Sequence, residues 1–237
     1  MQQSNFDDFS KKWWNIDGPL KLLHSMNQTR MLFIKERIFN RYQSFNNLEE
    51  ILAKKTILDL GCGGGILSES LAKIGGNVTA VDKSKALIDV AKKRAIEKKL
   101  KIDYRIDTIG NLVKKKNKFD IIISLEVIEH VESYKDFLKN IFLCLNSNGI
   151  VIISTINRNF FSYLSTILVA ENFLKMVPKG THDWSMYIKP EEILNFSKQN
   201  SISLDKKSGL IPLPCGKNFK WIRTNSTLVN YILSLIN

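Results

Sequence analysis

The chain has 237 residues, of which 44% are hydrophobic and 24% are charged. These fractions are typical of a globular domain and exclude collagen-like, low-complexity and disordered chains. With 35 basic and 23 acidic residues, the net charge is +12. Such an excess favours anionic partners such as nucleic acid, an acidic membrane surface or a phosphorylated substrate. The lysines are spread throughout the chain, so a general compositional bias is the favoured explanation of the charge.

The three cysteines, Cys62, Cys144 and Cys215, are far apart and form no C-x-x-C pair. A disulfide framework or a structural zinc site is therefore not expected, and a reducing compartment fits best. The first residues lack the basic and apolar regions of a signal peptide. No uncharged apolar run approaches the roughly 20 residues that a membrane-spanning helix needs. We therefore expect a cytoplasmic chain.

Residues 6–45 mix aromatic and basic residues at helical spacing, which predicts helices placed before the core. From Thr56 onward, short apolar runs alternate with longer amphipathic segments. The expected strands are Thr56–Leu60, Asn77–Val81, Ile102–Arg105, Asp120–Ser124 and Gly149–Thr155. The expected helices between them lie near Ile66–Ile74, Ser84–Lys99 and Ser133–Leu145. This alternation predicts an α/β fold whose parallel sheet is covered by helices on both faces.

The segment Gly61–Gly65 joins an expected strand to an expected helix through a glycine-rich turn, which lets a ligand approach the backbone closely. About 20 residues further on, Asp82 ends the next strand, where a carboxylate can accept hydrogen bonds from ribose hydroxyls. The two features together predict an adenosine-containing ligand. Ile66 stands where the dinucleotide fingerprint requires its third glycine, which argues against a nicotinamide-dependent oxidoreductase.

The run Asp59–Gly65 resembles motif I of the class I S-adenosylmethionine-dependent methyltransferases. The resemblance implies a Rossmann-like fold with a mostly parallel, seven-stranded sheet. It also implies that the glycine turn lies against the methionine part of the cosubstrate, that Asp82 holds the ribose and that Asp107 lies near the adenine. The segment Leu125–Val131 matches the part of the superfamily that borders both cosubstrate and substrate.

A closer resemblance, to the ubiquinone-biosynthesis O-methyltransferases, extends over roughly residues 6–195. It rests on Trp13-Trp14, Leu23–Asn27 with Arg30, Gly61–Leu67, Glu129–Val131, Ser154–Asn159, Val177–Asp183 and Ile188–Glu192, whereas the tail is only loosely similar. The family implies methylation of catechol-type hydroxyls on polyprenylated rings at both O-methylation steps, those of 2-polyprenyl-6-hydroxyphenol and 3-demethylubiquinol. The implied cosubstrate contacts are Arg30, Gly61, Gly63, Asp82, Asp107 and Leu125.

A phenol is a poor nucleophile at neutral pH until its proton is removed or a cation stabilises the phenolate. Glu126, Glu129 and His130 share one face if a helical turn begins after the fourth strand. They can then hold a divalent cation such as Mg²⁺ with open positions for both catechol oxygens. Alternatively His130 is the general base, with Glu126 as the other catalytic candidate. A third interpretation makes the carboxylates solvated and His130 structural.

Three other groups carry weaker signals. The resemblance places His24 near the pocket, and the segment containing His182-Asp183 is expected to be a loop that shapes it. Cys62 is interpreted as a small packed side chain, because no base is placed beside it.

Residues 160–177 are apolar and aromatic, are flanked by Arg158, Lys175 and Lys179, and are too short to span a bilayer. They are consistent with an interfacial segment, a cover for an isoprenoid tail or a helix packed on the sheet edge. We favour a membrane-contacting lid, and hence peripheral contact with the anionic cytoplasmic membrane of a bacterium. Other ubiquinone-biosynthesis proteins are further candidate partners.

The expected organisation is one methyltransferase domain over residues 1–237. It comprises an N-terminal helical cap (1–53), the cosubstrate-binding core (54–157), the insertion (158–187) and the C-terminal part of the sheet (188–237). The alternatives are a class I methyltransferase acting on another small molecule or on RNA, or a non-catalytic S-adenosylmethionine-binding protein. The Asp/Asn-Pro-Pro-Tyr motif and an RNA-binding module are both missing from the sequence, so nucleic acid is not the expected substrate.

Overall fold

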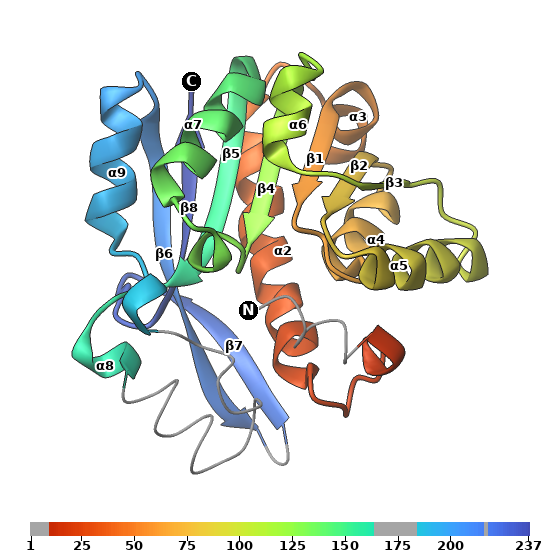
Figure 1. Cartoon of the computed structure of the whole chain (residues 1–237), viewed down its shortest axis with the longest axis horizontal. Coiled ribbons are helices and arrows are strands. Elements are labelled where there is room, and N and C mark those ends of the chain that lie inside the picture. Colours follow the sequence, from red (N-terminus) through yellow and green to blue (C-terminus); the bar gives the residue numbers. More distant parts are fainter. Residues whose placement is uncertain (1–9, 164–183, 216–217) are drawn as a thin grey trace.

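The computed structural model describes residues 10–163, 184–215 and 218–237 (Figure 1). Its helical elements are η1 (Ser10–Lys12), α2 (Lys21–Arg41), α3 (Leu48–Lys54), α4 (Ile66–Ala72), α5 (Lys85–Glu97), α6 (Ile109–Lys114), η2 (Ile128–His130), α7 (Tyr134–Cys144), α8 (Phe160–Tyr163), η4 (Trp184–Met186) and α9 (Pro190–Gln199). Its strands are β1 (Thr56–Leu60), β2 (Asn77–Asp82), β3 (Asp103–Ile106), β4 (Phe119–Leu125), β5 (Leu145–Ile156), β6 (Ser203–Cys215), β7 (Asn218–Thr224) and β8 (Asn230–Ile236).

The strands form a single sheet in the order β3-β2-β1-β4-β5-β8-β6-β7. The five strands from β3 to β5 are parallel to their neighbours, and β8, β6 and β7 continue the sheet as antiparallel strands. The α/β fold and the mostly parallel sheet expected from the sequence are therefore confirmed. All five predicted strands are present, each with ends within a few residues of the expected ones.

The described residues form eight strands, whereas the resemblance implied seven. The additional strand is β7, which forms a hairpin with the long strand β6 (Figure 1). From Ile211 onward β6 is paired with β7, past the end of its pairing with β8 at Leu210. Proline lacks a backbone N–H and is tolerated in a strand with one partner, which explains Pro212 in this part of β6. Because the apolar pattern is interrupted in this region, the hairpin of β6 and β7 could not be recognised from the sequence.

Helices cover both faces of the sheet (Figure 1). Successive strand residues point to opposite sides, so neighbouring residues of one strand pack against different helices. Ile57 and Ile121 pack with α2, α3, α4 and α5, whereas their neighbours Leu58 and Ile122 pack with α6, α7 and α9. Strands that are apolar on both faces are expected for parallel strands covered by helices. Two hydrophobic cores therefore hold the carboxyl ends of the strands in fixed positions.

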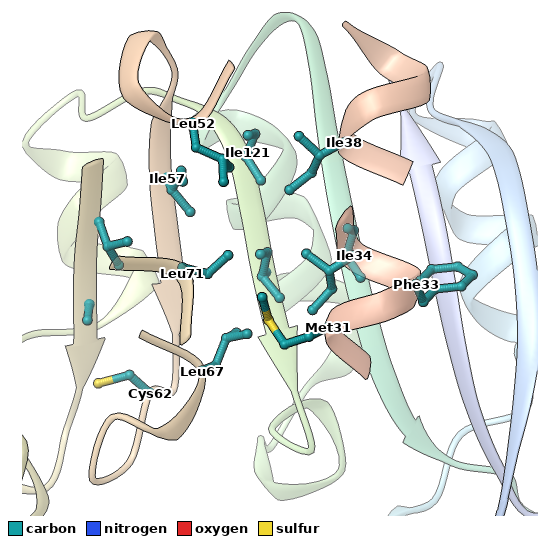
Figure 2. Packing of buried hydrophobic residues seen from close by; sticks show 14 of the residues in the cluster. Met31, Phe33, Ile34, Ile38, Leu52, Ile57, Cys62, Leu67, Leu71 and Ile121 are labelled. Atoms are coloured by element: carbon teal, nitrogen blue, oxygen red, sulfur yellow. The ribbon is translucent and has the colours of Figure 1, made fainter. Parts of the chain in front are cut away.

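Helix α2 is the longest helix among the described residues and crosses the sheet on one face. Met31, Ile34 and Ile38 lie on one stripe and point towards Ile57 and Ile121 on the strands (Figure 2). Burying each such side chain contributes about 1.5–3 kcal/mol. The helical spacing predicted for this region is confirmed.

Helix α6 was not expected from the sequence, because only Ile109 and Leu112 of its six residues are buried. Thr108 caps it, with its hydroxyl oxygen accepting a hydrogen bond from the Asn111 N–H at 3.3 Å. A side-chain cap of this kind stabilises a helix N-terminus by about 1 kcal/mol. The cap and two buried side chains are too weak a pattern to identify the helix.

Among residues 10–163, 184–215 and 218–237, we find no helix with the length and apolar character needed to cross a bilayer. Of the predicted membrane-contacting segment 160–177, the structure describes only the residues of α8. The remainder of the segment lies outside the described residues.

Candidate active site

The chemistry-bearing residues gather where the parallel strands end. The glycine loop Gly61–Gly65 follows β1, Asp82 ends β2, and Leu125 ends β4 next to β5. Because the carboxyl ends of parallel strands meet at one edge of a sheet, these segments from distant parts of the chain become neighbours. This edge is the usual ligand site of open α/β sheets.

The glycine loop is fastened to the end of β2. The N–H groups of Gly61 and Cys62 donate to the Val81 carbonyl oxygen at 2.8 and 3.0 Å, and the Gly63 N–H donates to Asp82 Oδ2 at 2.9 Å. Gly61 and Gly63 have φ of +77° and +53°, in the region that favours glycine. The structure therefore brings the predicted cosubstrate residues Gly61, Gly63 and Asp82 together.

Asp82 is held in a fixed orientation by backbone donors. Its Oδ1 accepts a hydrogen bond from the Ser84 N–H at 2.9 Å, and its Oδ2 accepts the bond from Gly63. Burial raises the pKa of Asp82 above its ordinary value, although these donors act against the shift. Each carboxylate oxygen can accept more than one hydrogen bond, so the two oxygens can also receive ribose hydroxyls.

Asp107 lies beside Asp82, because its N–H donates to the Asp82 carbonyl oxygen at 3.1 Å. Its own oxygens are bound by the Thr108 N–H at 2.9 Å and by Lys115 Nζ at 2.6 Å. Burial raises the pKa of Asp107, but Lys115 and Thr108 outweigh it and hold the pKa below its ordinary value. A contact with adenine stays a prediction.

Glu126 follows Leu125 in a left-handed conformation, with φ of +56°, which is rare for a residue with a side chain. Its N–H donates to the Ser154 carbonyl oxygen at 3.0 Å. Its Oε1 accepts a hydrogen bond from Ser154 Oγ at 2.8 Å and forms an ion pair with Arg30 Nη2. Backbone and side chain are therefore both fixed against β5, and strained residues of this kind cluster at functional sites.

Arg30, on α2, is only 4% exposed, and its Nε has no hydrogen-bond partner among the described residues. Breaking a buried pair by removing one partner costs about 3–5 kcal/mol, because the other charge stays buried. The pair with Glu126 therefore joins the N-terminal helix to the end of β4, across 96 residues of sequence.

Glu129, on η2, is buried, and its Oε2 accepts a hydrogen bond from Thr155 Oγ1 at 2.8 Å. Burial and, next, the charge of Glu126 raise the pKa of Glu129 well above its ordinary value. The two carboxyl groups therefore differ in environment. Glu126 is paired with a guanidinium, whereas Glu129 accepts a hydrogen bond from a hydroxyl group.

The metal prediction requires a helical turn that begins at Glu126, and the structure shows that no such turn forms there. Glu126 lies before a short 3₁₀-helix that begins at Ile128, and its left-handed backbone takes it out of helical register with Glu129 and His130. No group of three or more His, Cys, Asp or Glu side chains within the described ranges is arranged to hold a metal ion. Arg30 also occupies one oxygen of Glu126. A cation held by Glu126, Glu129 and His130 therefore stays a prediction.

The glycine loop and the segment after β4 touch directly. A Cβ added to Gly61 would lie 2.3 Å from Val127 Cγ2, so the side chain next to Glu126 fills the space that Gly61 leaves. The loop predicted to hold the cosubstrate and the carboxylate predicted to serve the substrate are thus adjacent.

Of the weaker candidates, His24 lies on α2 with its Nε2 2.7 Å from the Trp13 carbonyl oxygen. A carbonyl oxygen only accepts, so His24 Nε2 carries the proton in this bond. Cys62 is buried in the hydrophobic core, where burial and then the charge of Asp59 raise its pKa, which confirms the interpretation as a packed side chain. His182 and Asp183 lie outside the described residues.

Sequence reasoning gave no role to Ser154 and Thr155, which hold Glu126 and Glu129. One signal was available, because both hydroxyls end an apolar strand that is adjacent to the strand before Glu126. The register pairs Leu125 with Ser154.

Comparisons with known proteins agree with this geometry. A family model described as a methyltransferase domain matches residues 33–204. Among solved structures, the chain resembles magnesium protoporphyrin IX methyltransferase from Synechocystis with bound SAH, with a TM-score of 0.65 and 15% identity over 100% of this chain and 95% of that one. An S-adenosylmethionine-dependent methyltransferase from Clostridium acetobutylicum gives a TM-score of 0.59 and 17% identity over 85% of this chain and 89% of that one. Fold, glycine loop and family model together define a class I S-adenosylmethionine-dependent methyltransferase.

Curated relatives narrow the class. Proteins named ubiquinone biosynthesis O-methyltransferase are 39% identical in Pelagibacter ubique, over 98% of this chain and 95% of the relative, and 39% identical in Coxiella burnetii, over 97% and 92%. A relative of the same name in Bartonella tribocorum is 38% identical over 98% and 95%. The chain belongs to the ubiquinone biosynthesis O-methyltransferase family and is an O-methyltransferase with S-adenosylmethionine as its cosubstrate.

Proposed function

We propose that this enzyme methylates catechol-type hydroxyls of polyprenylated ubiquinone precursors at both O-methylation steps. The substrates are 2-polyprenyl-6-hydroxyphenol and 3-demethylubiquinol. The names of the relatives support the pathway, and the sequence motifs shared with the family support the two steps. The observation that carries the proposal is the contact between Gly61 and Val127, because it sets the cosubstrate loop against the segment with Glu126, Glu129 and His130.

Methyl transfer from a sulfonium is an in-line displacement, so most of the catalysis consists of aligning the hydroxyl oxygen with the methyl group. In this proposal Asp82 holds the ribose, the glycine loop lies along the methionine part, and Leu125 borders the cosubstrate. Arg30 binds the cosubstrate carboxylate, a role that suits a buried guanidinium with an unpartnered Nε.

For the substrate, Glu126 accepts a hydrogen bond from the hydroxyl to be methylated, and His130 is the general base that removes its proton. The phenolate oxygen then forms the new bond to carbon as the sulfonium leaves as a neutral thioether. A positioned acid or base contributes about 10²–10⁴-fold to such a reaction.

The test is transfer of a labelled methyl group from S-adenosylmethionine to short-tailed versions of both substrates, assayed separately. The matched control is the ring whose target hydroxyl already carries a methyl group. Product from both catechols and none from the control would support the proposal. Product from one catechol only would remove the second step, and product only from an RNA substrate would overturn the proposal.

The predicted divalent cation stays a prediction, and it requires that Glu126 turn away from Arg30. The same assay after treatment with a chelator decides it. Loss of product that added magnesium restores would support a cation at Glu126, Glu129 and His130. Unchanged product would leave proton removal to the side chains of His130 and Glu126.

We also propose that the enzyme is a cytoplasmic protein that contacts an anionic membrane through the segment 158–187, since its substrates carry isoprenoid tails. The described ends of that segment support the idea. The side chains of Phe160 and Phe161 on α8 are 70% and 59% exposed, and Trp184 is also exposed. Exposed aromatic residues near basic ones are typical of interfacial membrane binding.

A further inference from the structure

Trp13 packs onto the glycine loop from outside the sheet. A Cβ added to Gly64 would lie 2.3 Å from Trp13 Cδ1 and 2.5 Å from Nε1, and one added to Gly63 would lie 2.5 Å from Trp13 Cζ2. The indole therefore takes the space that a side chain at either position would need. The absence of side chains at Gly63 and Gly64 serves this close approach.

The indole N–H has no acceptor in the part of the chain that the structure describes, although Trp13 is only 6% exposed. A buried polar group without a partner costs about 1–3 kcal/mol. A donor that is buried, unpaired and set against a ligand loop is what a missing ligand atom would satisfy.

The segment around Trp13 is fastened independently of the loop. The Trp13 carbonyl oxygen accepts a hydrogen bond from His24 on α2. The neighbouring Trp14 lies with its ring 4.2 Å from the Arg94 guanidinium carbon, and Arg94 Nε donates to Glu69 Oε2 at 2.8 Å. Contacts with α2, α4 and α5 thus hold the Trp13-Trp14 segment in place independently of the glycine loop.

We propose that Trp13 is a cosubstrate-positioning residue. Its ring closes the outer side of the pocket over Gly63 and Gly64, and its N–H donates to an oxygen of the bound S-adenosylmethionine. The cosubstrate offers such acceptors in its ribose hydroxyls and its carboxylate. The proposal depends on the cosubstrate and not on the identity of the methyl acceptor.

The experiment compares Trp13→Phe with Trp14→Phe. Both changes keep an aromatic ring and remove a buried indole N–H that has no partner within the described residues, but only Trp13 touches the glycine loop. We expect Trp13→Phe to weaken S-adenosylmethionine binding about fivefold by calorimetry, as for one lost hydrogen bond. It should also remove most of the change in tryptophan fluorescence on cosubstrate titration. Trp14→Phe should alter neither.

Unchanged affinity in Trp13→Phe, or equal weakening by both variants, would overturn the proposal, because the segment would then act through packing alone. If Trp13→Phe does not fold, the unaltered protein still gives an answer by NMR. The Trp13 indole N–H signal is assigned by elimination, using phenylalanine variants of the other three tryptophans. A shift of that signal when the cosubstrate binds supports the proposal, and an unmoved signal refutes it.

Discussion

Glu126 is constrained in both its backbone and its side chain. Its backbone is left-handed, and its carboxylate is paired with the buried Arg30 and hydrogen-bonded by Ser154. Holding a residue with a side chain in this conformation costs about 1–3 kcal/mol, which the surrounding contacts must offset. The result is a carboxylate that is held in one orientation by its neighbours.

We predict that Glu126→Gln lowers kcat for methyl transfer at least about a hundredfold, because the amide keeps the shape but neither bears charge nor assists proton removal. The affinity for S-adenosylmethionine should change less than about threefold, since Arg30 stays in place and the cosubstrate carboxylate can pair with it. Steady-state kinetics and calorimetry on the same preparation measure both.

Glu132→Gln is the matched control, because Glu132 lies in the same segment but is exposed. It should leave both quantities unchanged. Near-normal turnover by Glu126→Gln would show that Glu126 takes no part in activating the hydroxyl.

At this scale the sequence predicts which residue types matter and where along the chain they lie. Gly61, Gly63 and Asp82 could be predicted because one continuous unit of strand, turn, helix and strand contains them. The pair between Arg30 and Glu126 could not, since it depends on how α2 crosses the sheet. The left-handed backbone of Glu126 also leaves no mark on the sequence, and it is the reason the predicted helical face is not formed.

Among the elements, the glycine loop between β1 and α4 leaves no room for a side chain at Gly61. Gly61 has φ of +77°, and the side chain of Val127 fills the space that a Cβ at Gly61 would need. We predict that Gly61→Ala lowers the melting temperature and weakens cosubstrate binding at least about tenfold, because the added Cβ must displace the segment that holds Glu126. Thermal unfolding and calorimetry check the two effects.

Gly110→Ala is the control, since the nearest atom to its added Cβ is Thr108 Oγ1 at 4.0 Å. Alanine in helix α6 should leave binding unchanged and stabilise the protein by about 0.5–1 kcal/mol. Equal loss of binding in both variants would mean that the effect of Gly61→Ala does not come from the contact with Val127.

The elements that could be predicted are those with strong periodicity, such as β1, β4 and α5. Helix α6 and strand β7 could not, because their evidence lies in tertiary contacts. For β7 these include a hydrogen bond from Thr29 Oγ1 on α2 to the Trp221 carbonyl oxygen at 2.8 Å.

For the whole molecule, the membrane proposal predicts binding to anionic vesicles at low salt that weakens as salt is added. The double variant Phe160→Ser/Phe161→Ser should reduce this binding at least about tenfold, because burial of each aromatic side chain contributes about 1.5–3 kcal/mol. Vesicle flotation measures the bound fraction. Activity on a short-tailed, water-soluble catechol should be unchanged.

Ile96→Ser provides the control, because Ile96 is 79% exposed on α5 and lies outside the proposed contact segment. If the double variant binds vesicles as well as this control does, the proposed contact through α8 is wrong. Binding to neutral vesicles with equal strength would remove the role assigned to the net charge.

The family and the mostly parallel sheet could be predicted from the sequence, because motifs from Trp13 to Glu192 resemble those of a known family. The eighth strand is a local addition that this pattern does not include. Strand β7 is tied to α2 through Trp221, whose Nε1 also donates to Ser25 Oγ at 2.9 Å.

Helix α2 presents Thr29 and Arg30 as consecutive residues, and each holds a different part of the molecule. Thr29 is bonded to β7 and Arg30 to Glu126. Because the backbone of a helix is nearly rigid, these two contacts set the position of the hairpin of β6 and β7 relative to the ion pair after β4. The hairpin exposes Ile211 and Leu213 to the surroundings. Two neighbouring residues of helix α2 thus join the edge hairpin of the sheet to the segment that follows β4.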